Sequence, residues 1–494
     1  MTRRRILLLG VVALGLLLGA CDIVEAPPNP DEPPLVIDPT TTTAAPAPAT
    51  TLPCESAPPT DPNPPLSGDV VDQSIELARR WSGCVSSAVL ARPGALDGAV
   101  GVAAAQSAPL IAWDPIRGDE IGAVLQDLGV SEIVTTSATI APALDVPITL
   151  AEPSDPPNPS DGPLWIVPES SLDSSLLRHL ASVNGATAIV GVPIQDLTDE
   201  QRTLIAGAGE VIWMPEPTST ERWQLAQILG GISTVNGTSD LLENTRFVAF
   251  YGNPTTGALG VLGEQGPEAT LERMAPIVAD YAADGALAVP TFEIIATVAD
   301  APPGDDGNYS AEMGPDLIRP WVDVATENGA YVVLDLQPGR TDFLTQAQRY
   351  EEFLRLPNVG LALDPEWRLG PNERHLRQIG SVTAEEINRV SEWLAGIVRE
   401  ELLPQKMLIV HQFRFDMIEG REQIELRPEL ATVIQMDGQG PLPTKYETFG
   451  ALTGAPDADR FAWGWKNFYD EDSPMATPAQ VLDLDPLPVF ISFQ

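Results

Sequence analysis

Residues 361–370 read LALDPEWRLG, an apolar run that ends in two carboxylates, an indole ring and a guanidinium. With Val359 and Gly360 before it, the apolar part is typical of a strand that is buried on both faces. When such strands form a parallel barrel, functional side chains lie at their carboxyl ends. The stretch therefore predicts one strand, Val359–Leu363, whose end carries Asp364 and Glu366.

Further apolar runs recur at a similar spacing through the C-terminal half of the chain, and each has the length of a strand. The expected strands are Phe247–Tyr251, Leu287–Phe292, Tyr331–Leu336, Val359–Leu363, Met407–Val410, Thr432–Met436, Phe461–Trp465 and Pro488–Ser492.

Helix signals lie between these runs. Pro267 is a proline suited to a first helical turn, and Thr383 with Glu386 three residues later forms a capping-box pattern. Eight strand–helix units in about 250 residues predict a TIM-like (β/α)8 barrel over residues 246–494. No helix follows the eighth run, so we expect a helix at Ser219–Gly230, in a bridge over residues 218–245, to cover that gap.

Residues 69–217 predict a small parallel α/β domain, with a sheet covered on both faces, because short apolar runs alternate with helical stretches. The expected strands are Ser87–Ala91, Pro109–Ala112, Glu132–Thr135, Pro163–Val167, Ala186–Val190 and Val211–Met214. The expected helices are Gly118–Leu128, Asp173–Val183 and Asp199–Ala208.

The N-terminus has the pattern of a targeting signal. Three arginines at positions 3–5 precede the apolar run Ile6–Leu18, and the run ends in the sequence LGAC at 18–21. That ending resembles a bacterial lipobox. The resemblance implies a lipoprotein signal peptide at residues 1–20, lipidation of Cys21, and anchoring to the outer face of the cell membrane. The alternative is an ordinary signal peptide with a chance cysteine.

Residues 21–68 are rich in Pro, Thr and Ala and cannot bury apolar surface, so we expect a disordered tether. An extracytoplasmic location permits a disulfide between Cys54 and Cys84, the alternative being two unpaired thiols. The net charge of −41 argues against a nucleic-acid partner, because no cationic excess exists to replace phosphate counterions.

Four carboxylates at expected strand ends are the candidate catalytic residues. Asp364 and Glu366 are two residues apart on a strand, so we expect their side chains to leave the same face. Two close carboxylates repel, and one then keeps its proton as a general acid would. Asp335 and Asp437 would supply the second carboxylate that glycoside hydrolysis requires. The alternative is a solvated turn in which Glu366 pairs with Arg368 or Arg340.

Other polar and aromatic side chains at the same strand ends are candidates for substrate binding. They are Tyr251, Asn253, Glu293, Gln337, Arg340, Trp367, Arg368, His411, Gln412, Gln435, Trp463 and Lys466. His411 has no second histidine at ligand spacing, so we expect no zinc site, no other metal and no cofactor. An oxygen-rich divalent site formed by Asp335, Asp364 and Asp437 stays open as an alternative.

Two resemblances add to this interpretation. Residues 91–99, ARPGALDGA, with APLI at 108–111, resemble a type 2 cell-wall-binding repeat. The sequences LDPEWRLGP at 363–371, QIGSV at 378–382, VHQF at 410–413 and FYDED at 468–472 resemble an uncharacterised family of secreted actinobacterial lipoproteins. The second resemblance implies a barrel fold and an extracytoplasmic location, and it assigns no catalytic residue.

The sequence therefore predicts a lipid-anchored cell-surface protein whose barrel binds a cell-envelope or imported glycan, with hydrolysis of that glycan as a further hypothesis. Two alternatives stay open. One is a non-catalytic cell-wall-binding or scaffold lipoprotein, and the other is a solute-binding lipoprotein that holds a small-molecule ligand.

Overall fold

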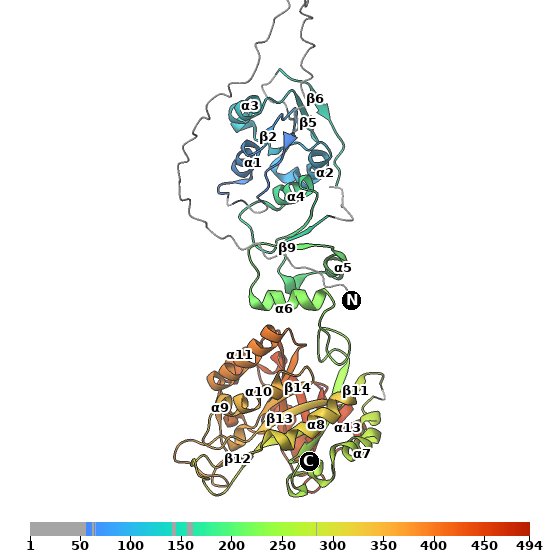
Figure 1. The fold of residues 1–494 in the computed structure, drawn as a ribbon, viewed down its shortest axis with the longest axis vertical. Coiled ribbons are helices and arrows are strands. Elements are labelled where there is room, and N and C mark those ends of the chain that lie inside the picture. The colour runs from blue at the N-terminus through green and yellow to red at the C-terminus, as the bar shows by residue number, and fades with distance from the viewer. Residues whose placement is uncertain (1–55, 62–63, 65, 141–144, 156–161, 283) are drawn as a thin grey trace, which may run out of the picture. The chain divides into compact units, whose positions relative to one another are not determined.

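The computed structural model describes residues 56–61, 64, 66–140, 145–155, 162–282 and 284–494 (Figure 1). The chain divides into two compact units, an N-terminal unit that ends at Pro217 and a barrel unit, Thr218–Gln494. The predicted signal peptide, most of the tether, Cys21 and Cys54 lie outside the described residues, so lipidation and the disulfide with Cys84 stay predictions. Within the described ranges, no helix is both long enough and apolar enough to cross a membrane.

The N-terminal unit contains two parallel sheets, whereas the sequence predicted one. The first has the order β4-β3-β5-β6, and the second has the order β8-β7-β9. Strand β6, which the sequence analysis missed, exposes all three of its side chains and ends the first sheet. Trp165 and Val167 of β7 still pack into the core that the first sheet forms, so both sheets share one core.

The strands of this unit are β3 (Ser87–Ala91), β4 (Leu110–Ala112), β5 (Glu132–Thr135), β6 (Ile148–Leu150), β7 (Leu164–Val167), β8 (Thr187–Val190) and β9 (Val211–Trp213), with a short antiparallel pair, β1 (Ser56–Ala57) and β2 (Ser82–Gly83). The helices are α1 (Val70–Arg79), α2 (Asp97–Ala105), α3 (Gly118–Asp127), α4 (Ser174–Val183) and α5 (Asp199–Gly207). The six predicted strands and three predicted helices are confirmed, with ends that differ by at most one residue.

The barrel unit is a closed ring of eight parallel strands, as predicted. They pair in the order β10-β20-β19-β18-β16-β14-β13-β11, and β11 pairs back with β10. The strands are β10 (Thr245–Gly252), β11 (Leu287–Ala299), β13 (Tyr331–Leu336), β14 (Val359–Leu363), β16 (Lys406–His411), β18 (Leu430–Met436), β19 (Ala462–Asn467) and β20 (Phe490–Phe493). Strand β11 runs beyond the ring and forms an antiparallel hairpin with β12 (Ser310–Glu312).

Alternate residues of each barrel strand face two different cores, as the period of two requires. One set, including Phe247, Tyr331, Met407 and Phe490, forms a small cluster inside the ring. The other set joins the larger cluster between the strands and the helices. Residues two positions beyond the inner cluster therefore face the interior at the carboxyl ends of the strands.

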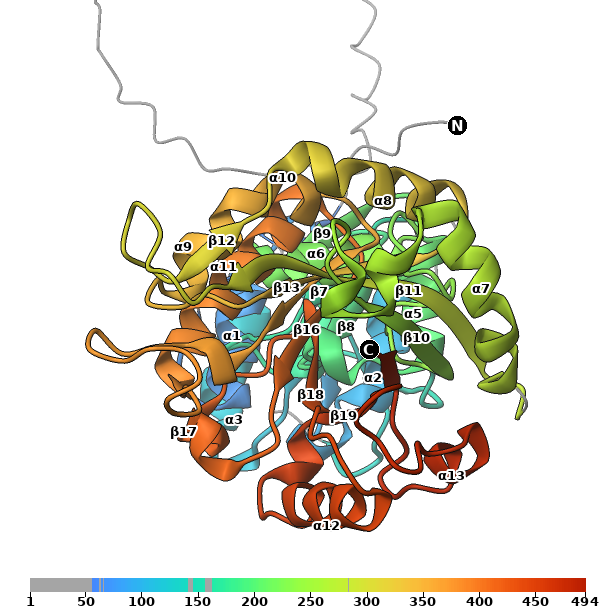
Figure 2. The same ribbon diagram turned by 90° about the horizontal axis from the view of Figure 1, so that it is seen from below.

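Most helices of the barrel unit, among them α7, α8, α10 and α12, lie outside the strands (Figure 2). They are α6 (Ser219–Ile228), α7 (Pro267–Asp280), α8 (Pro315–Glu327), α9 (Phe343–Ala347), α10 (Glu351–Leu354), α11 (Ala384–Glu401), α12 (Leu442–Thr453) and α13 (Pro478–Leu482). Pro267 stands in the first turn of α7, as predicted. Thr383 caps α11, but its predicted capping box is incomplete, because the Glu386 carboxylate binds Arg368 and the Phe343 N–H instead.

The bridge helix α6 occupies a different place from the one expected. The Trp223 Nε1–H donates to the Leu403 carbonyl at 2.7 Å, and the Thr220 hydroxyl donates to Glu429 at 2.7 Å. These partners precede β16 and β18, whose connection over residues 412–429 contains no α-helix. Helix α6 therefore packs beside α11 and the beginnings of these two strands, and the prediction that it fills a gap after β20 was wrong.

Candidate functional site

The inward-facing residues at the carboxyl ends of the strands form a polar cluster. It contains Tyr251 from β10, Glu293 from β11, Asp335 from β13, His411 from β16, Gln435 from β18, Lys466 from β19 and Ser492 from β20, together with Asp364 and Asp437 directly after β14 and β18. All of these residues are buried. The structure thus brings three of the four candidate catalytic residues, Asp335, Asp364 and Asp437, into this cluster, and the fourth, Glu366, is partly exposed beside them.

His411 is at the centre of this cluster. Its Nδ1 lies 2.9 Å from Asp437 Oδ2, and its Nε2 lies 3.3 Å from Glu293 Oε1 and 3.7 Å from Asp335 Oδ1. Burial alone would lower the pKa of His411, but the Asp335 charge and hydrogen bonds to Asp437 and Glu293 raise it well above the ordinary value. The imidazole is therefore held as a cation by carboxylates on both sides.

The second oxygen of two of these carboxylates is held by a hydroxyl group. The Tyr251 hydroxyl donates to Asp335 Oδ2 at 2.8 Å, and the Ser492 hydroxyl donates to Glu293 Oε2. Lys466 Nζ lies 3.4 Å from the centre of the Tyr251 ring. The sequence analysis did not propose Ser492 as a site residue. Ser492 is two residues after the inward-facing Phe490 on β20, so it lies on the same inner face.

Several buried polar atoms of the cluster have no hydrogen-bond partner among the described residues. They are Asp364 Oδ1, Asp437 Oδ1 and both side-chain polar atoms of Gln435, together with Glu293 Oε1, Asp335 Oδ1 and His411 Nε2, which face one another only at ion-pair distance. Buried polar groups without partners are rare and costly, and a concentration of them marks a place for a ligand, an ion or ordered water. Asp364, His411 and Asp437 also offer ligand atoms that all lie within 4.8 Å of one another.

Three carboxyl groups at this end of the barrel, Asp335, Asp364 and Glu366, have raised pKa values. Burial, then the nearby Glu366 charge, raise the pKa of Asp364 well above its ordinary value. Burial and the Asp437 charge raise the pKa of Glu366 to about 7, and burial raises the pKa of Asp335 to about 6. Negative charge is therefore in excess at this end of the barrel.

The sequence analysis expected Asp364 and Glu366 to raise the pKa of one carboxyl because they share a strand face. The pKa is raised, but the shared strand face is wrong. Strand β14 ends at Leu363, and Pro365–Trp367 form a 3₁₀ turn, because proline cannot continue the ladder. The two carboxyls are close enough to affect each other's charge, but they do not share a strand face.

Three candidate binding residues are engaged in structural contacts. The Asn253 amide donates to the Ile295 carbonyl and accepts from Thr255, so it shapes the loop after β10. Gln412 accepts from Arg421 at 2.8 Å and donates to the Arg414 carbonyl. Trp463 belongs to the outer core, and its Nε1–H donates to the Ala458 carbonyl, so it does not face the interior polar cluster.

The two candidate arginines have partners other than Glu366. Arg368 forms an ion pair with Glu386, at 2.9 Å from Nε to Oε1. Arg340 donates to the Glu373 carbonyl and lies 4.5 Å from the centre of the Tyr309 ring. Trp367 packs on His375, with ring centres 5.3 Å apart, and stays partly exposed beside Glu366. The Gln337 amide donates to the Tyr251 hydroxyl at 3.2 Å.

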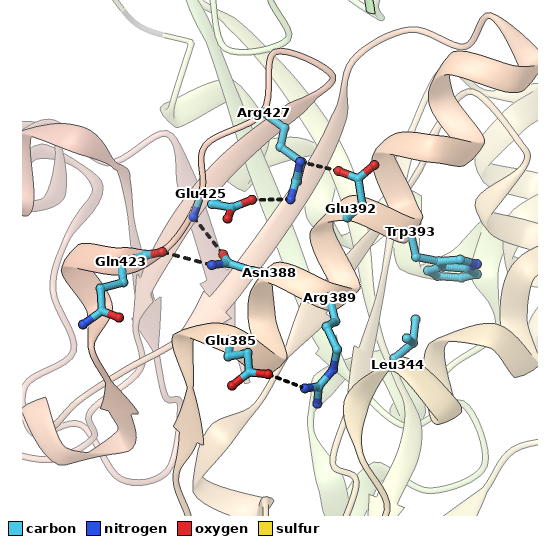
Figure 3. A pocket seen from close by; sticks show the side chains of 9 residues that line it. All are labelled: Leu344, Glu385, Asn388, Arg389, Glu392, Trp393, Gln423, Glu425 and Arg427. Atoms are coloured by element: carbon cyan, nitrogen blue, oxygen red, sulfur yellow. Dashed lines mark hydrogen bonds and ion pairs between the residues drawn. The ribbon is translucent and has the colours of Figure 1, made fainter. Parts of the chain in front are cut away.

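A surface depression of about 730 Å³ lies on the outer side of α11 (Figure 3). Its charged side chains pair with one another or with neighbours: Glu385 with Arg389, Glu425 with Arg427, and Glu392 with Arg399 and Arg427. The Asn388 amide bridges Gln423 and Glu425. The depression therefore contrasts with the barrel cluster, where polar atoms lack partners.

Comparisons with known proteins assign no function. No protein-family model matches the chain, and no curated protein matches it. One solved structure found to be similar is a D-allulose 3-epimerase from Methylomonas sp., at 11% sequence identity and a TM-score of 0.26. The match covers 50% of this chain and 84% of that one.

Proposed function

We propose that the barrel binds a glycan at the carboxyl ends of its strands and hydrolyses a glycosidic bond there. The observation that carries the proposal is the placement of Glu366, a partly exposed carboxyl, beside the buried carboxyls Asp364 and Asp437. Glycoside hydrolysis requires two such groups, one to donate a proton and one to activate water.

Glu366 is the proton donor in this proposal. It is the carboxyl beside the cluster that reaches solvent, so it can regain a proton after each turnover. Burial, then the Asp437 charge, raise its pKa and favour its protonated form. Its proton passes to the glycosidic oxygen while the bond between that oxygen and the anomeric carbon breaks.

Asp437 is the base. His411 holds its Oδ2 at 2.9 Å, and its Oδ1 has no partner among the described residues. The free oxygen accepts a proton from the water that attacks the anomeric carbon.

The charge of the cluster selects the substrate. The carboxyls outnumber the cationic groups His411 and Lys466, while Arg340 and Arg368 are engaged elsewhere. An anionic sugar would be repelled, so the substrate is a neutral or amino-sugar-containing glycan. The partly exposed Trp367 ring next to Glu366 offers a face on which a sugar can stack.

The cellular setting of the proposal comes from the N-terminal sequence. The lipobox-like LGAC at 18–21 and the Pro/Thr-rich residues after it favour a protein anchored through Cys21 outside the membrane. A cell-envelope or imported glycan is the substrate that such a location supplies.

The test is a screen for released reducing ends on purified envelope glycans. We expect release by the wild-type protein and a loss of at least 100-fold in Glu366→Gln and Asp437→Asn, since general acid–base catalysis contributes about 10²–10⁴-fold. Asp416→Asn, which removes an exposed carboxylate from the loop after β16, is the matched control and keeps wild-type activity. Background-level release by all four proteins would overturn the proposal.

A further inference from the structure

We propose that Asp364, His411 and Asp437 bind one divalent transition-metal cation. These residues end three strands that are neighbours in the barrel, β14, β16 and β18. Their ligand atoms lie within 4.8 Å of one another. Metal–ligand bonds of about 2.1 Å allow two ligand atoms up to about 4.2 Å apart, so small side-chain movements bring the three atoms onto one ion.

The unpartnered atoms of the cluster are an independent observation that points to the same place. Asp364 and Asp437 are 2% and 7% exposed, and each has one oxygen without a hydrogen-bond partner among the described residues. His411 is fully buried, and its Nε2 faces Glu293 Oε1 at 3.3 Å and Asp335 Oδ1 at 3.7 Å. Buried carboxylate oxygen atoms without partners are the groups that a cation would satisfy.

The charge balance also favours a cation. Glu293, Asp335, Asp364 and Asp437 are four buried carboxyls, and they face the cationic groups His411 and Lys466. A metal ligand must be deprotonated, so a divalent ion would replace the single charge of the imidazolium with two. The buried excess of negative charge becomes smaller, and the carboxylates can stay ionised.

The donor set indicates which ions fit. Calcium prefers six to eight oxygen ligands, whereas a mixed set of two carboxylates and one imidazole suits manganese, iron or zinc. Three protein ligands leave coordination positions open for water, which is the arrangement of catalytic metal sites. The set differs from the oxygen-only alternative of the sequence analysis, because His411 replaces Asp335.

The consequence for the reaction rests on the proposed function, whereas the cation site itself does not. A water molecule on the ion would lie beside Asp437 and lose its proton more easily than free water does. That water would be the one that adds to the anomeric carbon. The ion would thus supply the attacking group, and Asp437 would act as its ligand.

The test measures metal binding by the full chain, without any glycan. After treatment with a chelator and removal of the chelator, the protein is titrated with Mn²⁺ by calorimetry at physiological salt, and Zn²⁺ is tested in parallel. We expect one ion per chain, and at least a 100-fold weaker affinity in Asp364→Asn and in Asp437→Asn. Both substitutions keep side-chain size, and circular dichroism shows whether each variant is folded.

Asp416→Asn is again the control, because a chain with a net charge of −41 attracts cations weakly over its whole surface. Unchanged binding by this variant, with loss in the two site variants, would support the inference. Absence of a one-to-one Mn²⁺ or Zn²⁺ site in the wild-type protein, or equal binding by folded site variants, would overturn it. If one variant fails to fold, the number of ions bound by the wild-type protein and the affinity of the other, folded variant still test the cation site. Glycan release without metal binding would leave the hydrolase proposal standing alone, and metal binding without release would leave only the cation site.

Discussion

His179 in the N-terminal unit and His411 in the barrel are both buried, yet their surroundings affect their charge in opposite directions. His179 packs on Trp81, with ring centres 6.2 Å apart, in an apolar core, and burial lowers its pKa to about 4. His411 lies among three carboxylates, which raise its pKa. Burial alone therefore does not single out a histidine as a candidate functional residue, whereas burial among opposite charges does.

The largest expected effect comes from removing the charge at the centre of the barrel cluster. His411→Leu leaves Glu293, Asp335 and Asp437 buried without their shared cation, and we expect the barrel unit to lose about 3–5 kcal/mol of unfolding free energy. Hydrogen exchange of amides in β14 and β16, measured with a chelator present, reports the barrel separately from the other unit. The matched variant His179→Phe, in the same buffer at pH 7, should leave barrel exchange unchanged. A loss below about 1 kcal/mol in His411→Leu would show that the two histidines do not differ in the way proposed.

The acid sensitivity of the N-terminal unit is the next effect in size. The folded pKa of His179, about 4, lies below the ordinary 6.5, so the unfolded chain binds the proton first as the pH falls. Stability from this group is complete above pH 6.5. It falls by about 1.4 kcal/mol per pH unit down to pH 4, a total of about 3 kcal/mol.

The measurement is hydrogen exchange of α4 peptides between pH 7 and pH 4, corrected for the intrinsic exchange rate at each pH. His179→Phe keeps an aromatic ring on Trp81 and removes the proton site, so the difference between the two proteins should appear only below pH 6.5. A difference that does not change with pH would contradict the role given to burial.

The difference between the two histidines also shows what the sequence reveals. The barrel strands and their polar ends were predictable, because apolar runs define buried strands and parallel topology brings their carboxyl ends together. Which side chain points inward was harder to predict, since strands buried on both faces are apolar throughout. Trp463 and Lys466 were both proposed to bind substrate, and they lie on opposite faces of β19.

Side chains alternate between the two faces along each strand, so one polar residue in an apolar strand shows which residues face the barrel interior. In β19, Gly464 and Lys466 face inward while Trp463 and Trp465 join the outer core. An added Cβ at Gly464 would lie 1.9 Å from Gln435 Oε1, so only glycine leaves room for that inward amide. The polar Lys466 in this mostly apolar strand thus identifies its inner face. On β20, the polar Ser492 identifies the inner face in the same way.

The smallest of the expected effects concerns the hydroxyl that holds Glu293. Ser492→Ala removes the donor to Glu293 Oε2 and leaves a buried carboxylate oxygen without a partner, which costs about 2 kcal/mol. Removing both groups together, in Ser492→Ala with Glu293→Gln, should cost less than the sum of the single changes, because a neutral amide tolerates the loss better than a carboxylate does. The coupling free energy from this double-mutant cycle, measured by barrel hydrogen exchange, should be about 1–2 kcal/mol. A value near zero would mean that Ser492 only fills space. The negative charge that raises the pKa of His411 would then come from Asp335 and Asp437 alone. The pKa difference between His179 and His411 would depend on fewer residues than the geometry indicates.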